Sequence, residues 1–370
     1  MKDADNIQIT LTAIDDLAKQ LSTIEQKWQA LERSINNQNF FLSWSWMKVW
    51  LLYKPNDLYL LEGTINGRLI ALAFIVESKN QKMTKQGCWL NKTGDLQLDQ
   101  VWIEYNDFLL APDVAKVARQ KLLDFLFNNN QVRCQRLFFD MTMCTQLAGG
   151  QHFSSRQTLV TSGYKKVLSH VSDLDSLLLS LSKNTRQQIR RSLKLLEQSG
   201  PVQLDFINGS EQIVRAANTI AKLHINQWQD SEWGSGFNNP YFVSFHQHLM
   251  QTKQAEILEL RHNDKALAYG YYFCFNKRVL FYLSAMTKHE NNQIKIGLVM
   301  HILAMLKFAE LGYDEYDFLA GDARYKRSLS DSSYDMVSYC LDKNNWLGKT
   351  ERFFRTLKQK ITNKVEQQSG

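Results

Sequence analysis

Apolar residues recur at helical spacing near the start of the chain, at Leu17, Leu21, Ile24, Trp28 and Leu31. This three-to-four-residue period predicts an amphipathic helix. An aromatic-rich stretch follows, and its spacing over 46–53 predicts a second helix. Clustered tryptophans of this kind usually belong to the core, and we expect that here.

The pattern then changes to strands. The stretch "LYLLEGTINGRLIALAFIVES" has two apolar runs flanking Asn66-Gly67, a dipeptide typical of tight hairpin turns. Shorter strands are predicted near "QGCWLNK" and "YNDFLLA". A helix follows in "PDVAKVARQKLLDFLFNN", with proline at its start, and then a strand in "VRCQRLFFDMT".

The same order returns after residue 250. Three antiparallel strands are predicted, with turns at Asn263-Asp264 and Asn276-Lys277. A helix follows over 294–311, with Gly312 as its stop, and then the strand "DEYDFLAG". The hairpin beginning at Leu61 aligns with the one beginning at Leu258 at an offset of 197, which places Glu62 opposite Glu259 and Asn66 opposite Asn263. With the helix and strand that follow in each half, this indicates an internal duplication.

These patterns predict an α/β (α+β) protein of two tandem domains, each a mixed, mostly antiparallel sheet flanked by helices. The expected limits are 1–158, 159–345 and a basic C-terminal helix or tail over 346–370. The boundary is placed in the polar, glycine-containing stretch around 150–165.

Composition narrows the class of protein. The 370 residues include 44 Lys and Arg against 37 Asp and Glu, a net charge of +7, which favours anionic partners. The five cysteines are scattered without a CxxC motif, so reduced thiols and no metal site are expected. The polar N-terminus and the lack of a long apolar run predict a cytoplasmic protein without a transmembrane segment.

The stretch "SKNTRQQIRRSLKLLEQSGP" predicts a basic helix capped by Ser182. Its apolar face turns inward, whereas Lys183, Arg186, Arg190 and Lys194 form a cationic surface without acidic partners along the helix until Glu197. A solvated face is the usual meaning of such a run. Unpaired like charges also suit a bound phosphate, which arginine can hold through two hydrogen bonds.

Three further stretches carry candidate chemistry. In "YDFLAGDARYKRSL" a strand ends at a glycine, and Asp322, Tyr325 and Lys326 follow in an expected loop that could equally be a salt-bridged surface turn. His224 and Trp228 lie four residues apart on one helix, although a lone histidine is more often structural. The helix start in "NNQIKIGLVMHI" could hold a pyrophosphate.

Taken in order, "LSKNTRQQIRRSLKLLEQSGPV", "LHINQWQDSEWGSGF", "LAYGYYFCFNKRVLFYLSAMT" and "AELGYDEYDFLAGDARYK" resemble the GNAT-type acyltransferases of the CelD/BcsL group, relatives of the FemAB peptidoglycan aminoacyltransferases. The resemblance implies acyl transfer to an amine or hydroxyl, often in cell-envelope or polysaccharide pathways. The family's acyl-CoA loop resembles Q/R-x-x-G-x-G/A, of which "QIKIGLV" keeps only Gly297.

The resemblance also implies a distribution of roles. Catalysis is expected from Asp322, Tyr325 and Lys326, with Asp322 orienting or deprotonating the acceptor and Lys326 holding developing negative charge. The acyl-CoA co-substrate would lie at the start of the 294–311 helix and along the preceding strand, and the acceptor would be an anionic small molecule or a glycan-linked substrate. The implied acyl-CoA residues are Ser284, Met286, Lys295, Ile296 and Gly297. The implied substrate-binding residues are Lys183, Arg186, Arg190, His224, Trp228 and Tyr282.

Other interpretations stay open from the sequence. The basic helix would serve a FemAB-like enzyme equally well, with aminoacyl-tRNA as donor. A non-catalytic nucleic-acid-binding protein would use that helix and the tail "KTERFFRTLKQKITNKV", and its affinity would depend steeply on salt. The same tail, with its phenylalanines, would also suit a protein that binds a membrane surface.

Overall fold

The computed structural model describes residues 6–36, 39–53, 57–78, 87–231, 234–251 and 255–344. Its strands are β1 (Ile7–Ala13), β2 (Leu58–Ile65), β3 (Arg68–Ser78), β4 (Gly87–Leu90), β5 (Leu109–Leu110), β6 (Arg136–Thr142), β7 (Phe153–Val167), β8 (Val202–Phe206), β9 (Ala255–His262), β10 (Lys265–Phe275), β11 (Arg278–Met286), β12 (Glu315–Ala320) and β13 (Ser332–Lys343). Its α-helices are α1 (Leu17–Arg33), α2 (Trp44–Leu51), α3 (Ala115–Asn128), α4 (Leu174–Leu179), α5 (Lys183–Ser199), α6 (Ser210–Trp228), α7 (Pro240–Leu249), α8 (Ile296–Glu310) and α9 (Arg324–Leu329). Short 3₁₀ turns lie at Phe40–Leu42 (η2), Leu98–Val101 (η3) and Gly236–Asn238 (η4).

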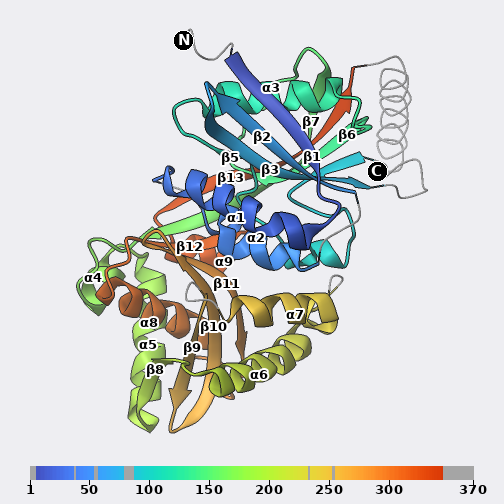
Figure 1. Ribbon diagram of the computed structural model, residues 1–370. Coiled ribbons are helices and arrows are strands. Elements are labelled where there is room, and N and C mark those ends of the chain that lie inside the picture. Colours follow the sequence, from blue (N-terminus) through green and yellow to red (C-terminus); the bar gives the residue numbers. More distant parts are fainter. Residues whose placement is uncertain are drawn as a thin grey trace, which may run out of the picture.

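The described strands form one continuous sheet with a symmetric order. It runs β1-β2-β3-β4-β6-β13-β7-β12-β11-β10-β9-β8, and β5 pairs with β3 off this path. We call β1 through β6 the first half and β8 through β12 the second half. In each half three antiparallel pairings lead to one parallel pairing, β4 with β6 and β11 with β12. The predicted duplication of a mixed, mostly antiparallel sheet flanked by helices is confirmed (Figure 1).

The last strand of each repeat crosses to the other half. β7 follows β6 in the chain but pairs with β12, whereas β13 follows β12 and pairs with β6. β7 and β13 then pair antiparallel with each other over the length of β13. The two halves are therefore joined by main-chain hydrogen bonds at the centre of the sheet (Figure 1).

The predicted hairpins form as their turn residues require. Asn66 and Gly67 both have positive φ, 50° and 79°, and so do Asn263 and Asp264, at 48° and 61°. Two consecutive left-handed residues make the type I′ turn, whose twist matches that of the flanking strands. The register agrees with the repeat, because Ile65 pairs with Arg68 and His262 with Lys265.

Two hydrophobic cores hold the layers together. The second core packs α5 and α8 onto one face of the second-half sheet. The first core fills the first half and continues under α6 and α7 on the opposite face of the second half. Phe40 stacks on Phe273 across the two halves, with ring centroids 4.4 Å apart, and α2 packs against α7 (Figure 1). The tryptophans of α2 are buried, as expected of core residues.

Four strands were not predicted, and one segment was misassigned. β1, β7, β8 and β13 are absent from the sequence-based assignment, and the presumed polar linker around 150–165 is largely the strand β7. Most of β7 is exposed or half-buried, so its side chains carry no period-two signal, and its neighbours β12 and β13 determine its structure. The proposed domain limits stay predictions, and the basic tail over 346–370 lies outside the described residues.

Candidate active site at the seam of the two halves

The parallel strands β11 and β12 separate partway along their length. They pair only over Arg278–Leu280 and Glu315–Asp317, after which β11 stays with β10 and β12 stays with β7. Beyond this point the two strands share no main-chain hydrogen bonds, and we call this separation of β11 from β12 the opening. Open α/β sheets commonly bind ligands at the carboxyl ends of their strands. This opening is the structural centre of the candidate site.

The equivalent opening in the first half is closed by the chain itself. β4 ends at Leu90, and the buried Asn91 and Asn106 fill the space beside β6. The Asn91 side chain donates to Asn106 Oδ1 (3.0 Å), and the Asn106 side chain donates to the Leu90 carbonyl (2.9 Å). The loop from 91 to 108 therefore leaves its own half without an opening and continues toward the second half.

Three ionisable side chains hold the end of β12. The amide of Leu319 donates to Asp317 (2.8 Å), and the amide of Ala320 donates to Glu104 Oε2 (2.8 Å). The ammonium of Lys326 donates to the carbonyl of Ala320 (2.6 Å) and lies 3.4 Å from that of Leu319. Leu319 has a φ of 60°, a left-handed conformation that is costly for a branched residue, so these contacts maintain a strained bulge.

The first half supplies Glu104 to this bulge. Burial raises the pKa of Glu104 to about 7, against the lowering effects of the Ala320 amide and of Lys326. The residue keeps part of its surface open to solvent. A carboxylate with a pKa near neutrality can accept a proton from a substrate at physiological pH.

Asp317 is the second carboxylate, but it is enclosed. It is fully buried and accepts hydrogen bonds from the hydroxyls of Tyr105 and Tyr334. Burial raises its pKa and also the pKa of both tyrosines. The ammonium of Lys165 lies over the two rings, 4.9 Å from the centroid of Tyr334. Asp317 therefore serves the structure of the seam and has no open path to a substrate.

Tyr325 lies on the α8 side of the sheet. Its ring stacks on His301 with centroids 5.1 Å apart, and burial raises its pKa to about 12. Burial also lowers the pKa of His301 to about 3, with a further contribution from Lys326. Tyr325 therefore keeps its proton at neutral pH and can act as a proton donor. The expected loop is in part the short helix α9, because residues 324–329 complete a helical turn.

Asp322 and Lys326 occupy different environments although they are close in sequence. The side chain of Asp322 is 56% exposed, accepts from the Tyr164 hydroxyl (2.7 Å) and lies 3.4 Å from Arg327. Lys326 is 9% exposed, and burial lowers its pKa despite the nearby Glu104 and Asp317. In the structure, the ammonium of Lys326 is held by main-chain carbonyls of the bulge.

The residues expected to bind acyl-CoA lie near one another. A side-chain carbon placed on Gly297 would meet Met286 at 3.4 Å, so the end of β11 adjoins the start of α8. The amide of Lys295 donates to Ser192 Oγ on α5 (3.0 Å). No side chain caps α8, whose first residue is Ile296. Ser284 is half-buried on the same strand as Met286.

The basic helix forms as predicted, but its charges are partly satisfied. Ser182 caps α5 by accepting from the Thr185 amide (3.2 Å). Arg190 pairs with Asp175 of α4 (2.8 Å), and Arg186 donates to the carbonyls of residues 179 and 181 (3.0 Å each). The premise that this surface lacks acidic partners is therefore wrong for Arg190, because the partner comes from another helix. Within the described part of the chain, Lys183, Arg191 and Lys194 have no ion pair.

The remaining candidates lie on the opposite face, under and along α6 and α7. The ring of His224 stacks on Trp228 at 5.9 Å, and its Nδ1 lies 2.8 Å from the Ser235 hydroxyl. Burial lowers the pKa of His224 to about 4, so it is neutral at pH 7. Tyr282 donates to the carbonyl of Val101 (2.6 Å), which joins β11 to the loop that carries Glu104.

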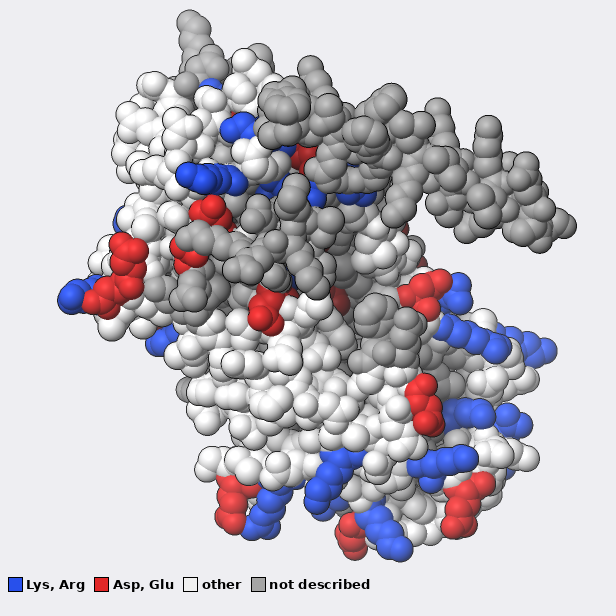
Figure 2. Space-filling model, turned by 90° about the vertical axis from the view of Figure 1, so that its right-hand side faces the viewer, with Lys and Arg blue, Asp and Glu red and all other residues white. Residues whose placement is uncertain are grey.

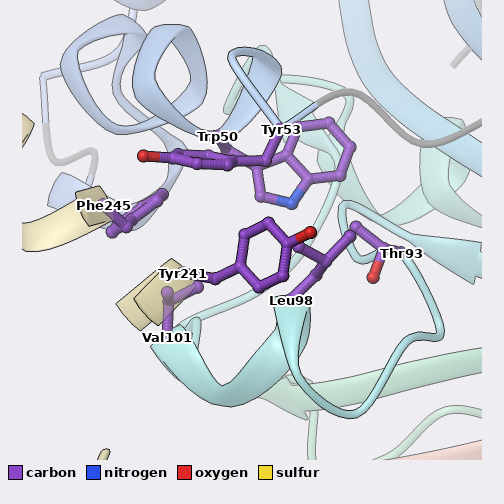
Figure 3. Close-up of a pocket in the computed structure, with 7 residues that line it drawn as sticks. All are labelled: Trp50, Tyr53, Thr93, Leu98, Val101, Tyr241 and Phe245. Carbon is purple, nitrogen blue, oxygen red and sulfur yellow. The ribbon is translucent and has the colours of Figure 1, made fainter. Parts of the chain in front are cut away.

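Two hollows lie elsewhere among the described residues. The first, between α2 and α7, is lined by Trp50, Tyr53, Thr93, Leu98, Val101, Tyr241 and Phe245 (Figure 3). Its volume of about 10 Å³ admits roughly one water molecule. The second, of about 490 Å³, lies between α4, β8 and α8 and is lined by none of the candidate residues.

Two further features were sought in the described part of the chain. The described residues include no cluster of potential metal ligands. None of the described helices is long and apolar enough to cross a bilayer.

A family model matches part of the second half of the chain. Residues 183–327 match the model of the acetyltransferase (GNAT) domain, which indicates an acyltransferase. This region begins at the first residue of α5 and ends within α9, so it contains β11, α8, β12 and the expected catalytic residues. A search of curated protein sequences finds no match.

Solved structures resemble the chain over most of its length. FemX matches with a TM-score of 0.55 and 13% identity, covering 85% of this chain and 95% of FemX. The C-terminal domain of a putative lysylphosphatidylglycerol synthetase from Agrobacterium fabrum matches with a TM-score of 0.52 and 10% identity, covering 91% and 96%. A conserved protein of unknown function from Bacteroides thetaiotaomicron VPI-5482 gives 0.51 and 12%, covering 90% and 100%. At these identities the likeness is one of fold.

Sequence reasoning missed Glu104. It lies in "VWIEYND", which has no motif and no helical or strand period. The only local signal is the pair of left-handed residues around it, Trp102 and Tyr105, and backbone angles are not visible in a sequence.

Proposed function

We propose that the protein is an acyltransferase that moves an acyl group from acyl-CoA to an amine or hydroxyl of a cell-envelope or polysaccharide-related acceptor. The observation that carries this proposal is the opening between β11 and β12, with Glu104 on one face and Tyr325 on the other. A proton acceptor and a proton donor on opposite faces of one opening suit direct transfer between two substrates.

The proposed step proceeds by nucleophilic attack. The acceptor nitrogen or oxygen attacks the thioester carbonyl, a C–N or C–O bond forms, and the C–S bond breaks. Glu104 takes the proton from the acceptor, and Tyr325 supplies a proton to the departing thiolate. Glu104 then releases its proton to solvent, and Tyr325 recovers one from solvent. Positioning of the two substrates supplies a large part of the rate.

The acyl-CoA would bind on the α8 side. Gly297 leaves the start of α8 open beside Met286, and uncapped amide groups at a helix start attract phosphate. Arg191 of α5 directly precedes Ser192, whose hydroxyl accepts from the amide of Lys295, whereas Lys183 and Lys194 lie on the outer face of the helix. Asp322 would orient the acceptor, since Glu104 takes the proton. Lys326 would hold developing negative charge and also maintains the bulge that positions Glu104.

A second candidate is transfer of an aminoacyl group from tRNA. FemX and the putative lysylphosphatidylglycerol synthetase share the fold, and the exposed cations of α5 would suit a polynucleotide as well as a nucleotide. The donor distinguishes the two proposals, whereas the acceptor chemistry is the same.

The test compares donors directly. Purified protein is incubated with acetyl-CoA or longer acyl-CoA and a panel of amines and sugar alcohols, and release of free thiol is followed. Aminoacyl-tRNA is offered in parallel. Thiol release that depends on both the acceptor and Glu104 supports the first proposal. Consumption of aminoacyl-tRNA alone supports the second, and turnover of neither donor with any acceptor would remove both.

A further inference from the structure

The loop that carries Glu104 also presents an exposed tryptophan, Trp102, whose backbone adopts an unfavourable left-handed conformation. Trp102 has a φ of 45° and leaves 52% of its surface in solvent. A left-handed conformation is a true outlier for a bulky residue, and such strain persists only where the surroundings enforce it.

The surroundings do enforce this conformation. The buried carboxylate of Asp99 accepts from Thr93 through both its amide and its hydroxyl and from the Gly94 amide, at 2.8 to 2.9 Å. The side chain of Asn239 on the facing helix donates to the Gln97 carbonyl (2.7 Å). The carbonyl of residue 101 accepts from Tyr282. Trp102 is thus fixed in space although half of it lies in water.

Trp102 begins a line of rings that ends at another exposed tryptophan. The line, which we call the aromatic ledge, consists of Trp102, Phe242, Phe237, His224 and Trp228. Successive centroids lie 6.4, 5.1, 5.4 and 5.9 Å apart. The two phenylalanines are buried, and Phe242 contacts the Trp102 ring while Phe237 contacts the His224 ring. Trp228, at the other end of the line, is 43% exposed.

Charge around the ledge selects among ligands that stack on aromatic rings. The loop from 95 to 104 carries only acidic charges, at Asp95, Asp99 and Glu104, and α7 carries no Lys, Arg, Asp or Glu. Figure 2 looks onto the α6 and α7 side, where a broad uncharged area covers the middle of the lower half and the basic side chains lie toward its margins. Single-stranded nucleic acids and anionic membranes require a cluster of cations beside the aromatic residues. Among the described residues, α6 carries Lys222 near His224, and its other cation, Arg215, is paired with Glu211.

We propose that the aromatic ledge binds the sugar rings of a neutral glycan, which is the acceptor or the carrier of the acceptor group. The C–H face of a pyranose is weakly positive and stacks on the negative face of an indole ring. The exposed polar side chains of α6 and α7, among them Asn226, Gln227 and Gln247, offer hydrogen-bond partners to sugar hydroxyls. Trp102 is two residues from Glu104, so a bound glycan would lead into the proposed catalytic centre. The proposal rests on the proposed function.

The test measures binding without catalysis. Isothermal titration calorimetry of the full chain with chitotetraose, cellotetraose and maltotetraose should show binding of at least one. Trp102→Asn keeps a residue that tolerates the left-handed backbone and removes the ring, and it should weaken affinity about tenfold, as should Trp228→Ala. Trp102→Phe should retain most of the affinity. Leu96→Ala is the matched control, since Leu96 is 81% exposed on the same loop but outside the ledge.

Several outcomes would overturn the proposal. One is equal affinity of the wild type, Trp102→Asn and Trp228→Ala. Another is the absence of binding of all three oligosaccharides. A third is binding only of oligoadenylate, or only of phosphatidylcholine–phosphatidylglycerol vesicles, which would assign the ledge to a nucleic acid or a membrane. If glycan binding depends on the ledge while neither donor is turned over, the ledge stands and the acyltransferase proposal fails.

Discussion

Glu104 shows how a single buried carboxyl links activity to stability. Its pKa is raised from 4.5 to about 7 because of burial, so the folded protein holds this proton more tightly than the unfolded chain does. The resulting contribution to stability is complete below pH 4.5 and is lost as the pH rises through about 7. At pH 8, where the carboxylate would accept a proton, it therefore destabilises the fold.

We predict that Glu104→Gln separates the two effects. Turnover should fall at least about 100-fold, as expected for loss of a general base, whereas thermal stability at pH 8 should rise. In the wild type kcat should increase with pH up to about 7 and then level off, and this dependence should disappear in the variant. Glu310→Gln, which changes an exposed carboxyl on α8, is the control. An unchanged pH profile in Glu104→Gln would exclude Glu104 as the base.

Lys326 and Asp322 should respond differently to substitution, because one is buried and the other is exposed. Lys326→Ala leaves the carbonyls of the bulge without their donor, so unfolding free energy should fall by about 1–3 kcal/mol. Turnover should fall roughly 30- to 1000-fold through the displaced bulge and the lost positive charge. Asp322→Asn should leave stability nearly unchanged.

Chemical denaturation and steady-state kinetics provide the measurements for these two variants, with the exposed Lys265→Ala as the control. For Asp322→Asn, a change in kcat would indicate a base, and a change in KM for the acceptor would indicate an orienting group. A stable and fully active Lys326→Ala protein would contradict the role of Lys326 in the bulge.

At the scale of elements, α5 presents two groups of cations with different surroundings. Arg186 and Arg190 contact α4, whereas Lys183, Arg191 and Lys194 have no ion pair within the described residues. Arg191 precedes Ser192, whose hydroxyl contacts the start of α8. Because Lys183, Arg191 and Lys194 lack ion pairs in the described part of the chain, we expect them, rather than Arg186 and Arg190, to meet an anionic donor. Lys183 and Lys194 belong to the cationic surface selected from the sequence.

We predict that replacing Lys183, Arg191 and Lys194 by Gln raises KM for the donor about tenfold or more at low salt, with little change in melting temperature. The salt dependence of KM should weaken at the same time, because fewer cations meet the phosphates. Replacing Arg186 and Arg190 should instead lower stability and leave KM for the donor nearly unchanged. The reverse pattern would assign the donor site to Arg186 and Arg190 instead.

The elements that sequence patterns predicted are those whose own residues determine their structure. The hairpin turns follow from Asn-Gly and Asn-Asp, and the end of α8 follows from Gly312, which has a φ of 80°. Long apolar strands such as β3 and β10 were equally visible. β7 and β13 depend on partners nearly 180 residues away in sequence, so no local window reveals them.

The same distinction applies to the candidate site. Asp322, Tyr325 and Lys326 follow a predicted strand and could be found from its end. Glu104 reaches them from a loop more than 200 residues earlier, because the first half uses this loop to close its own opening. Glu104 comes next to the end of β12 only because the two repeats pack together, so its position cannot be predicted from the local sequence.

At the scale of the whole molecule, the exchange of β7 and β13 makes the halves interdependent. The second half and its neighbouring strand β7 lie in one continuous segment of the chain, whereas the first half pairs with β13 from the end of the described chain. Phe40 and Phe273 add a shared core across the seam. A cut in the chain before β7 therefore separates the first half from β13, the strand that pairs with β6.

We predict that fragments 1–150 and 151–370 are each poorly folded alone but form one stable complex when co-expressed. β13 of the second fragment should pair with β6 of the first, and the aromatic core should close around Phe40. Shortening the second fragment to 151–331 removes β13 while keeping β7 through β12, and this should greatly weaken association. Co-purification with one tagged fragment, circular dichroism and melting curves measure these effects. If 1–150 and 151–331 each melted cooperatively and did not associate, the halves would be independent domains, and the exchanged strands would contribute little to joining them.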